Sequence, residues 1–341
     1  MVLTARKSSI LRLIAEDYIS SAQPVASSTV AKALGLQVSS ATVRNEMSGL
    51  EQDGYIHRPH VSSGGVPTEK GFRQLVTWLE DRLTVSGNDA DRMSMGLQNS
   101  DIDVDEWADT AAGILSVLLD TVAFATPLRS KNSSIKAIQL HELQKMLVML
   151  VIVMEEAVIL RQVIPTASPV TQNELEHSRN RLSQVMVGKS MRSLQGAETM
   201  VSHELDRQIV RSAINLAQKQ AVTSSKERKY HGFSRLFRQP EFVDDGHKAR
   251  MAAAAVENDE VFSALSSSIS GSPDVLTYIG SENSHESLKQ FSVILCDYGV
   301  EGQSEGVIGV LAPIRMAYQR AIPLVSFTGS SLNTLASSIY G

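Results

Sequence analysis

Closely spaced helix-ending residues near the N-terminus constrain this chain more than any other feature of its sequence. Apolar residues at helical spacing run from Ile10 to Tyr18, and Pro24, Gly35 and Gly54 then interrupt the pattern. Proline lacks an amide donor, and glycine readily takes the left-handed conformation that follows a last helical turn. The sequence therefore predicts three short helices in succession and excludes a single long helix.

Hydroxyl side chains mark the predicted helix starts. Thr4 precedes the first helix. The second helix can begin at Ser27 or Ser28, and the third at Ser39 or Ser40. A serine or threonine oxygen at such a position accepts a hydrogen bond from an otherwise unpaired backbone N–H of the first turn. The capping residues and the helix-ending residues therefore predict the same three helices.

An extended run, Tyr55 to His60, follows the third helix and leads into the small residues 62–65. A glycine-containing turn between extended segments predicts a β-hairpin. Thr68 then starts a fourth helix, whose apolar residues include Phe72. Three helices, a hairpin and a connecting helix predict a winged helix-turn-helix domain over residues 1–82.

The rest of the chain predicts an α+β domain that a helical insertion interrupts. Its two parts, residues 104–172 and 231–341, both contain strand-like apolar runs, whereas residues 173–230 carry a mostly helical pattern. Residues 83–103 lack either periodicity and are rich in serine, aspartate, asparagine and glycine, which predicts a linker. The strand-like runs are Ile135–Leu140, Met146–Met154, Val158–Ile164, Val275–Gly280, Phe291–Tyr298 and Val307–Pro313.

Composition restricts the class of protein and the cellular compartment that we expect for this chain. With 341 residues, 43% of them apolar and 20% charged, the chain can build two or three cores and is neither disordered nor fibrous. Its one cysteine, Cys296, permits no internal disulfide, so we expect a reducing, cytoplasmic location. The longest apolar run, Met146 to Met154, is too short to span a bilayer, so we expect no membrane segment.

Charge is distributed unevenly along the chain. Residues 1–73 contain eight lysines and arginines against six acidic residues, a net charge of +2, although the whole chain carries −5. Contacts to a polyanion depend on local patches rather than on total charge. The division weakly suggests that the N-terminal segment meets a polyanion.

The third helix, expected over Ser40–Asp53, has two different faces. Val43, Met47 and Leu50 lie on one side at helical spacing and predict a core face. The opposite face is small and polar, and a major groove about 12 Å wide admits a helix of this kind. Arginine suits the guanine edge, asparagine the adenine edge and an alanine methyl the thymine methyl. The outward residues are Ala41, Asn45 and Ser48, flanked by Arg44.

Further polar residues near this helix are candidates for phosphate contacts. Arg58, His60 and Ser62 lie along the predicted wing, and Lys70 and Arg73 begin the next helix. Cationic side chains, hydroxyls and backbone N–H groups are the usual partners of phosphate oxygens. The two histidines of the wing lack a nearby cysteine or acidic partner, so we expect no metal there.

No recognisable local motif predicts catalysis. The sequence shows no paired acid and base, no Ser-His-Asp order and no Cys-His grouping, and the glycines around Ser304–Gly306 lack the spacing of a dinucleotide-binding loop. We therefore expect a protein that is not an enzyme and binds no cofactor. A broad apolar stripe on the helix predicted over Glu198–Lys219 suggests that the insertion serves dimerisation, because inverted-repeat sites favour two-fold dimers. The same stripe could equally pack inside the chain.

The run from Leu3 to Phe72, which includes SATVRNEMSGLEQDGYI, resembles the N-terminus of the heat-inducible transcription repressor family that controls bacterial chaperone operons. The resemblance continues nearly to the C-terminus, in blocks that follow the order of the family. These blocks are IKAIQL (Ile135–Leu140), FRQPEF (Phe237–Phe242), IGSEN (Ile279–Asn283), DYGV (Asp297–Val300), IGVLAP (Ile308–Pro313) and AIPLV (Ala321–Val325).

The resemblance implies a homodimer with a winged-helix DNA-binding domain, a GAF-like domain and an inserted dimerisation domain. It also implies that the dimer represses chaperone genes by binding an inverted repeat in double-stranded DNA. The chaperonin would maintain the active repressor until heat diverts it to unfolded proteins. One departure concerns the wing, where Gly65 stands at the family's usual arginine. Matched by position, the groove-reading residues are Ser39, Ser40, Ala41, Thr42, Arg44 and Asn45.

An alternative interpretation is that the chain is a metabolite-sensing winged-helix regulator whose GAF-like domain binds a small ligand. No convergent polar set in the sequence identifies such a ligand. The two readings differ in whether a metabolite raises the thermal stability of the protein.

Overall fold

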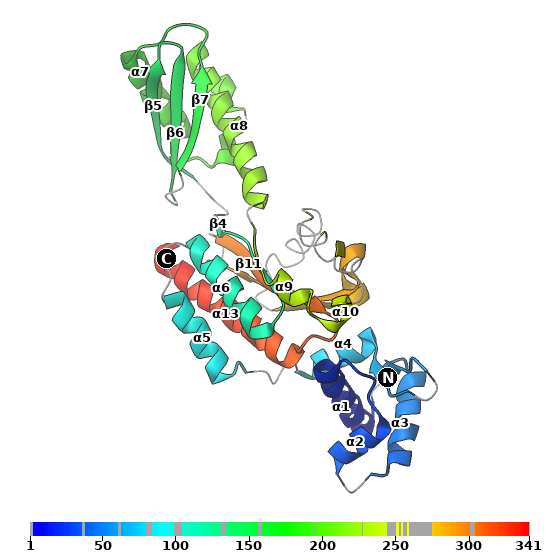
Figure 1. The fold of residues 1–341 in the computed structure, drawn as a ribbon. Coiled ribbons are helices and arrows are strands. Elements are labelled where there is room, and N and C mark those ends of the chain that lie inside the picture. Colours follow the sequence, from blue (N-terminus) through cyan, green and yellow to red (C-terminus); the bar gives the residue numbers. More distant parts are fainter. Residues whose placement is uncertain are drawn as a thin grey trace. The chain divides into compact units, whose positions relative to one another are not determined.

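The computed structural model shows an α+β protein that divides into two compact units (Figure 1). One unit comprises Met1–Thr126, Lys229–Tyr298 and Gly306–Leu335, and the other comprises Pro127–Arg228, Gly299–Glu305 and Ala336–Gly341. The residues that the structure describes are 3–35, 38–60, 63–79, 84–98, 104–130, 134–155, 159–194, 196–226, 228–243, 250–251, 254, 258, 275–300 and 304–340.

The first unit begins with the three short helices that the sequence predicts, α1 (Ala5–Ser21), α2 (Ser27–Leu34) and α3 (Ser40–Gln52). The Thr4 hydroxyl accepts a hydrogen bond from the backbone of Lys7 at 3.3 Å, which confirms the first cap. Gly35 follows α2 with a φ of 82°, in the left-handed region that glycine tolerates. A shared core joins the helices; its largest members are Ile10, Leu11, Ile14, Met47 and Leu50.

The predicted hairpin is also present, as β1 (Ile56–His57) paired antiparallel with β2 (Val66–Pro67), and α4 (Glu69–Leu79) follows it. Gly65, the residue directly before β2, exchanges two backbone hydrogen bonds of 2.9 Å with Val25. A side chain at Gly64 would place its Cβ 2.3 Å from the Val25 carbonyl carbon, so glycine is required there. Gly65 is buried beside Met47, which places this departure from the family pattern in the packed base of the hairpin.

A helix occupies most of the segment that the sequence predicts as a linker. Helix α5 (Gly87–Gln98) packs on α6 (Val104–Leu119), and Met93 and Leu97 of α5 are buried. The Ser86 hydroxyl caps it by accepting from the Asp89 backbone at 3.2 Å. The prediction of irregular structure is therefore wrong for residues 87–98. The segment has few apolar residues, and these form the buried side of a helix only because α6 packs against them.

The central sheet of the first unit is antiparallel and has the strand order β8-β3-β11-β10-β9. Strand β4 belongs to the second unit and pairs there with Ser304 and Glu305, the part of β11 that lies in the same unit. Helix α13 (Tyr318–Tyr340) packs closely on the central sheet, because a Cβ at Gly329 would lie 2.5 Å from the Cys296 sulfur. Burial raises the pKa of the Cys296 thiol to about 12, so this thiol is inert at neutral pH. The strands and small helices are β3 (Val122–Ala125), β4 (Arg129–Ser130), β8 (Lys229–His231), α9 (Phe233–Leu236), α10 (Pro240–Val243), β9 (Leu276–Ile279), η3 (Gly280–Glu282), η4 (Glu286–Leu288), β10 (Phe291–Tyr298) and β11 (Ser304–Pro313).

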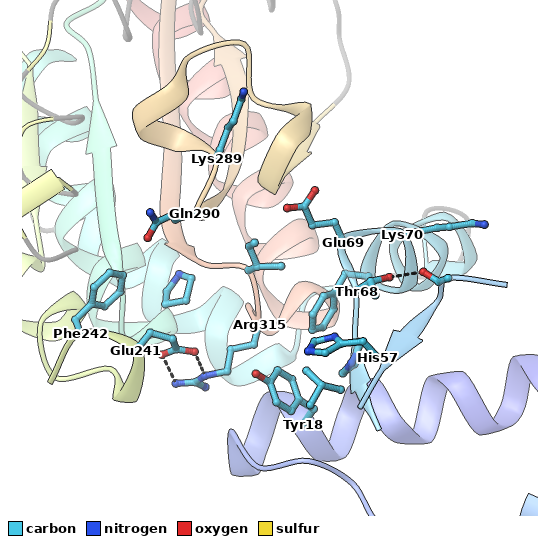
Figure 2. A pocket seen from close by; sticks show the side chains of 16 residues that line it. Tyr18, His57, Thr68, Glu69, Lys70, Glu241, Phe242, Lys289, Gln290 and Arg315 are labelled. Atoms are coloured by element: carbon cyan, nitrogen blue, oxygen red, sulfur yellow. Dashed lines mark hydrogen bonds and ion pairs between the residues drawn. The ribbon is translucent and has the colours of Figure 1, made fainter. Parts of the chain in front are cut away.

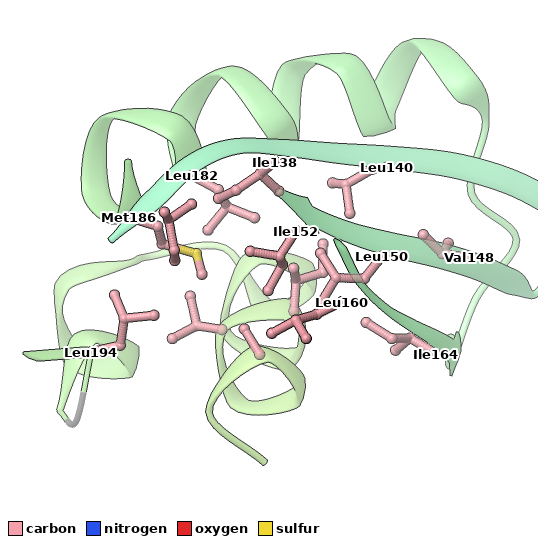
Figure 3. Packing of buried hydrophobic residues seen from close by; sticks show 14 of the residues in the cluster. Ile138, Leu140, Val148, Leu150, Ile152, Leu160, Ile164, Leu182, Met186 and Leu194 are labelled. Atoms are coloured by element: carbon pink, nitrogen blue, oxygen red, sulfur yellow. The ribbon is translucent and has the colours of Figure 1, made fainter. Parts of the chain in front are cut away.

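The second unit contains a separate three-stranded antiparallel sheet whose one face is covered by helices (Figure 3). We expected its strands in the first part of the GAF-like domain, but the structure places them with the helices that follow. The alternating burial of β6 explains this, since its inward residues need the helices as a partner surface. The elements are β5 (Ile135–Gln144), β6 (Leu147–Met154), β7 (Ile159–Pro165), α7 (Gln172–Met186), η1 (Met191–Leu194), η2 (Ala197–Met200) and α8 (Glu204–Lys226).

A buried polar network fixes the two long helices of this unit to each other. Asp206 of α8 is 1% exposed and accepts hydrogen bonds from Ser178 and Arg181 of α7. Burial alone would raise the pKa of Asp206, but the hydrogen bonds from Arg181 and Ser178 outweigh it and lower that pKa. The carboxylate therefore stays ionised and paired, and it sets the packing of α7 against α8.

Candidate nucleic-acid interface

Helix α3 separates a buried face from an open one. Val43, Met47 and Leu50 are at most 1% exposed and belong to the core of the N-terminal helices. This burial fixes the helix by its apolar side and leaves the opposite side in contact with solvent. Ser40, Ala41, Arg44 and Asn45 are exposed there, and Thr42 and Ser48 are partly exposed.

The first turn of α3 is held by hydroxyl groups. The Ser39 hydroxyl accepts from the Thr42 backbone at 3.1 Å and lies 2.9 Å from the Thr42 hydroxyl, which shows Ser39 to be the cap. The hydroxyls of Ser40 and Ser27 lie 3.3 Å apart and connect α3 to the start of α2. These small polar residues thus hold the first turn of α3, link it to α2 through Ser40 and contribute to the exposed surface.

Basic residues neutralise the acidic residues within α3 and directly after it. Asp53 pairs with Lys7 at 2.8 Å, Glu51 with Arg58 at 3.6 Å and Glu46 with an arginine of α1 at 3.8 Å. Within the described ranges, Arg44 has no ion-pair partner. The electrostatic result is an exposed guanidinium on a helix whose own carboxylates are compensated. Sequence reasoning missed this, since partners so far apart in the chain carry no local signal.

The residues of the predicted wing do not share one environment. His60 is exposed in a turn that Ser63 closes, with the Ser63 hydroxyl donating to the His60 carbonyl at 2.7 Å. The Arg58 side chain is only 16% exposed, because it pairs with Glu51 and donates to the Ser48 hydroxyl at 3.4 Å. Ser62, also expected to contact phosphate, lies outside the described residues.

The two basic residues of α4 are bonded within the protein. Lys70 donates to the Asp53 carbonyl at 2.7 Å, and its ammonium lies 4.4 Å from the centroid of the Tyr55 ring. This places a cation at the C-terminal end of α3, where the helix dipole is negative. Arg73 forms an ion pair with Glu282, so the structure gives it a role other than the phosphate contact expected for it.

A cleft of about 740 Å³ lies beside α1 and the base of the hairpin (Figure 2). Arg315 crosses its wall, with its guanidinium donating to the Glu241 carboxylate, to the Gln239 side chain at 2.7 Å and to the Ile19 carbonyl at 3.1 Å. Burial, followed by the nearby Glu241 charge, raises the pKa of Tyr18. The charge of Arg315 is therefore already compensated by the protein, which gives an anionic metabolite little to bind at this point.

The comparisons with known proteins now decide the family. Residues 105–322 match the model described as HrcA protein C terminal domain. The chain belongs to the HrcA family of heat-inducible transcription repressors. It is 30% identical over 340 residues to the repressor of Dehalococcoides mccartyi, covering 100% of this chain and 98% of that one. With the repressor of Herpetosiphon aurantiacus the identity is 32% over 348 residues, covering 99% and 97%.

A solved structure supports the fold. The crystal structure of a hypothetical protein aligns with 99% of this chain and all of its own, with a TM-score of 0.65 at 19% identity. The family resemblance seen in the sequence blocks is confirmed, and with it the α+β fold class and the assignment to transcription repressors. None of the helices in the described ranges is long and apolar enough to cross a membrane.

Proposed function

We propose that this protein is a winged-helix repressor of chaperone operons that binds an inverted repeat as a homodimer in the cytoplasm. The observation that supports this most is the exposed polar face of α3, which lies opposite its buried residues Val43, Met47 and Leu50. A helix anchored by one side and polar on the other fits a major groove. Repression would follow because a bound dimer excludes the polymerase from the promoter.

Within this proposal the residues of α3 have distinct roles. Arg44 would read guanine, Asn45 adenine, and the Ala41 methyl a thymine methyl, because these pairings match hydrogen-bonding patterns and shapes. Phosphate contacts would come from side chains and backbone N–H groups around the first turn and the wing. Ser39, Ser40 and Thr42 would line the groove beside these three residues, and the supporting contacts would come from Ser48, Arg58, His60 and Ser62 and from Lys70 at the start of α4.

The dimer contact that we propose uses the sheet of the second unit. The apolar stripe expected for self-association on α8 is occupied inside the unit, with Ile209 and Ala213 both 0% exposed, and that helix begins at Glu204 rather than at residue 198. By contrast, Ile159 and Val163 of β7 are 64% and 48% exposed on the face of the sheet opposite the helices. A second copy of the chain would cover this face, since an inverted repeat calls for two-fold self-association.

The decisive experiment compares DNA duplexes in a mobility-shift assay. Purified protein should retard a duplex that carries the inverted repeat and leave a scrambled duplex of equal length and composition unshifted. Val163→Asp should lower the sedimentation coefficient to that of a monomer and weaken the shift, whereas Gln184→Asp, at an exposed position of α7 on the other side of the sheet, should change neither. Equal shifts with both duplexes would overturn sequence-specific repression.

Control by heat and chaperonin is part of the same proposal. Operator binding should fall on heating and recover when chaperonin and ATP are added to the heated sample. Many folds are only marginally stable, so modest heating can empty the active state. Complete recovery without chaperonin would contradict the chaperonin's role while leaving operator binding intact.

A further inference from the structure

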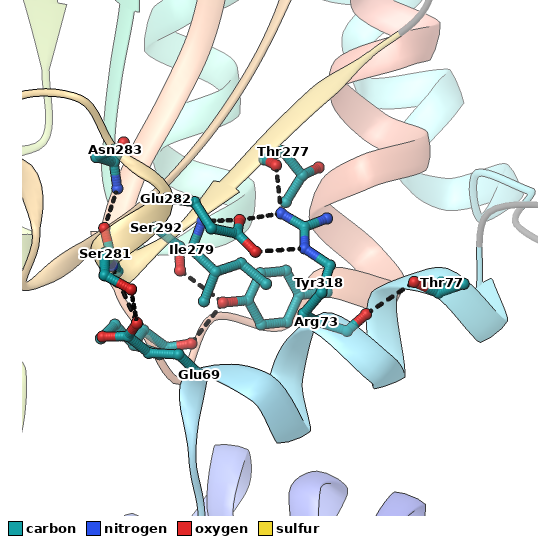
Figure 4. Close-up of polar contacts among 12 residues, drawn as sticks. Glu69, Arg73, Thr77, Thr277, Ile279, Ser281, Glu282, Asn283, Ser292 and Tyr318 are labelled. Carbon is teal, nitrogen blue, oxygen red and sulfur yellow. Dashed lines mark hydrogen bonds and ion pairs between the residues drawn. The ribbon is translucent and has the colours of Figure 1, made fainter. Parts of the chain in front are cut away.

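Helix α4 is packed into the body of the first unit by aromatic side chains. Polar contacts between α4 and the β9–η3 segment accompany this packing (Figure 4). Phe72 is 1% exposed, and its ring centroid lies 5.8 Å from that of Tyr318, the first residue of α13. Tyr318 is itself buried and shares a 2.6 Å hydrogen bond with the Ser292 hydroxyl of β10. Burial raises the pKa of Tyr318, so its hydroxyl stays protonated. The apolar side of α4 is thus anchored to strand β10 through Tyr318.

Two polar contacts extend this anchor along α4. Arg73 donates to the Glu282 carboxylate at 2.7 Å and to the Thr277 carbonyl at 2.6 Å. One turn earlier, Glu69 accepts hydrogen bonds from both the backbone N–H, at 3.0 Å, and the hydroxyl of Ser281. An arginine and a carboxylate on one face of the helix therefore meet their partners on the same short segment, β9 to η3.

The receiving segment is shaped for α4. Gly280 has a φ of 54°, and a Cβ at this position would lie 2.3 Å from the Glu69 carboxyl carbon. The Asn283 side-chain amide holds the turn by lying 2.9 Å from the Gly280 carbonyl and 3.0 Å from the Phe291 carbonyl. Residues of the IGSEN block (Ile279–Asn283) therefore build a docking surface for α4, a use that none of the roles described above assigns to them.

A third contact engages α1 in the same way. Arg315 donates to the carbonyl at the end of α1, Ile19, and is held by Gln239 and Glu241 of the FRQPEF block. The IGSEN and FRQPEF blocks lie more than two hundred positions after the residues of α4 and α1 that they help to hold. They thus fix both ends of the N-terminal helical segment, which runs from α1 to α4. None of these contacts covers Arg44 or Asn45, which remain exposed.

We propose that this docking surface is a positioning device that holds the N-terminal helical segment at a fixed orientation, so that both α3 helices of a dimer meet their half-sites together. The inference rests on the proposed function. Two half-sites require a defined separation of about 34 Å or a multiple of it, and a loosely tethered reading helix gains less from its partner's binding. Arg73, Glu282, Glu69 and Ser281 are therefore positioning residues, which act on DNA only through α3.

The test uses the full chain, the variant Arg73→Glu and a matched control. Arg12→Glu makes the same charge change on an exposed arginine of α1 whose only described ion pair is with Glu16, one turn away. Affinity is measured for the complete inverted repeat and for a duplex carrying one half-site. Arg73→Glu should lose roughly ten-fold or more on the complete repeat relative to the control, with equal affinity for the half-site. Adding Glu282→Arg to Arg73→Glu should recover part of the loss.

Hydrogen exchange supplies a readout that needs no DNA. Arg73→Glu should speed exchange of the α4 amides, and Arg12→Glu should leave them as in the parent protein. Equal losses on both duplexes, or no loss on the complete repeat, would overturn the positioning role. If the parent protein binds neither duplex, the proposed function fails, and unchanged exchange in α4 of Arg73→Glu would then overturn the docking contact as well.

Discussion

Helices α3 and α4 are close neighbours in the chain, yet their polar side chains are used in opposite ways. Arg44 and Asn45 of α3 are exposed, whereas Glu69 and Arg73 of α4 are bonded to the β9–η3 segment. Exposed groups remain available to a ligand, and paired groups hold the protein to itself. The contrast assigns reading to α3 and positioning to α4, so that substitutions in the two helices should change different measurable quantities.

The largest effect is expected from Phe72→Ala, on the α4 side. The ring is 1% exposed and packs against Tyr318, so truncation leaves a cavity and lowers the free energy of unfolding by about 3–5 kcal/mol. Chemical denaturation followed by circular dichroism measures this loss. Arg44→Ala is the control, with an expected change within about 0.5 kcal/mol. A comparable loss of stability in Arg44→Ala would erase the distinction between the helices.

Arg44→Ala should instead act on DNA. Removing an exposed guanidinium from the open face of α3 should cost about 1–3 kcal/mol of specific binding and relax the preference at one base pair of each half-site. Competition binding across single-base operator variants measures both effects. Arg12→Glu serves as the charge control and should alter affinity without altering base preference. Unchanged discrimination in Arg44→Ala would remove α3 from the reading role.

The pair of Asp89 and Arg320 joins α5 to α13, and its dependence on pH tests the stability of the first unit without involving either α3 or α4. Two hydrogen bonds of 2.8 Å from Arg320 lower the pKa of Asp89, which is 3% exposed on α5. Because the folded pKa lies below the unfolded value of about 3.9, the pair stabilises the fold above that value and loses its effect as pH falls through the folded pKa. Asp89→Asn should cost about 1–2 kcal/mol at neutral pH, a figure kept low because Arg320 is 48% exposed.

Acid titration of stability checks this prediction. The parent protein should lose the contribution of the pair on the acid side, and Asp89→Asn should lack that part of the pH dependence. Its base preference on DNA should equal that of the parent protein. An unchanged acid profile in Asp89→Asn would show that the pair contributes nothing to the fold.

Local chemistry explains which parts of this molecule could be predicted from sequence. The caps at Thr4 and Ser39 and the stops at Gly35 and Gly54 act on neighbouring residues, so the N-terminal helices were predicted closely. The open face of α3 followed from helical spacing in the same way. Position in a helix decides exposure there, and no distant segment intervenes.

Long-range pairing explains what could not be predicted. Arg73 was expected to contact phosphate, but its partner Glu282 lies 209 positions away and no local pattern announces it. Helix α5 was missed because Met93 and Leu97 need α6 to bury them. The strands of the second unit were expected in the first part of the interrupted α+β domain, since a strand pattern shows which face is buried and not which surface buries it.

Lys70→Ala should have the smallest effect, and it tests where the DNA-reading role of α3 ends and the positioning role of α4 begins. The ammonium of Lys70 lies at the junction of α3 and α4, donating to the Asp53 carbonyl at 2.7 Å above the Tyr55 ring. Its removal takes a cation from the negative end of α3 and should cost about 0.3–1 kcal/mol of stability. Because the amine is already bonded to the protein, DNA affinity should fall slightly and equally for operator and scrambled duplexes, as competition binding can measure.

Lys70→Arg is the matched variant, since it keeps the charge at the end of α3 and should restore most of the affinity. A change of base preference in Lys70→Ala as large as that in Arg44→Ala would mean that reading extends beyond α3 into the first turn of α4. The division between a reading helix and a positioning helix would then fail at their junction, even if the contacts of Arg73 proved to hold α4 in place.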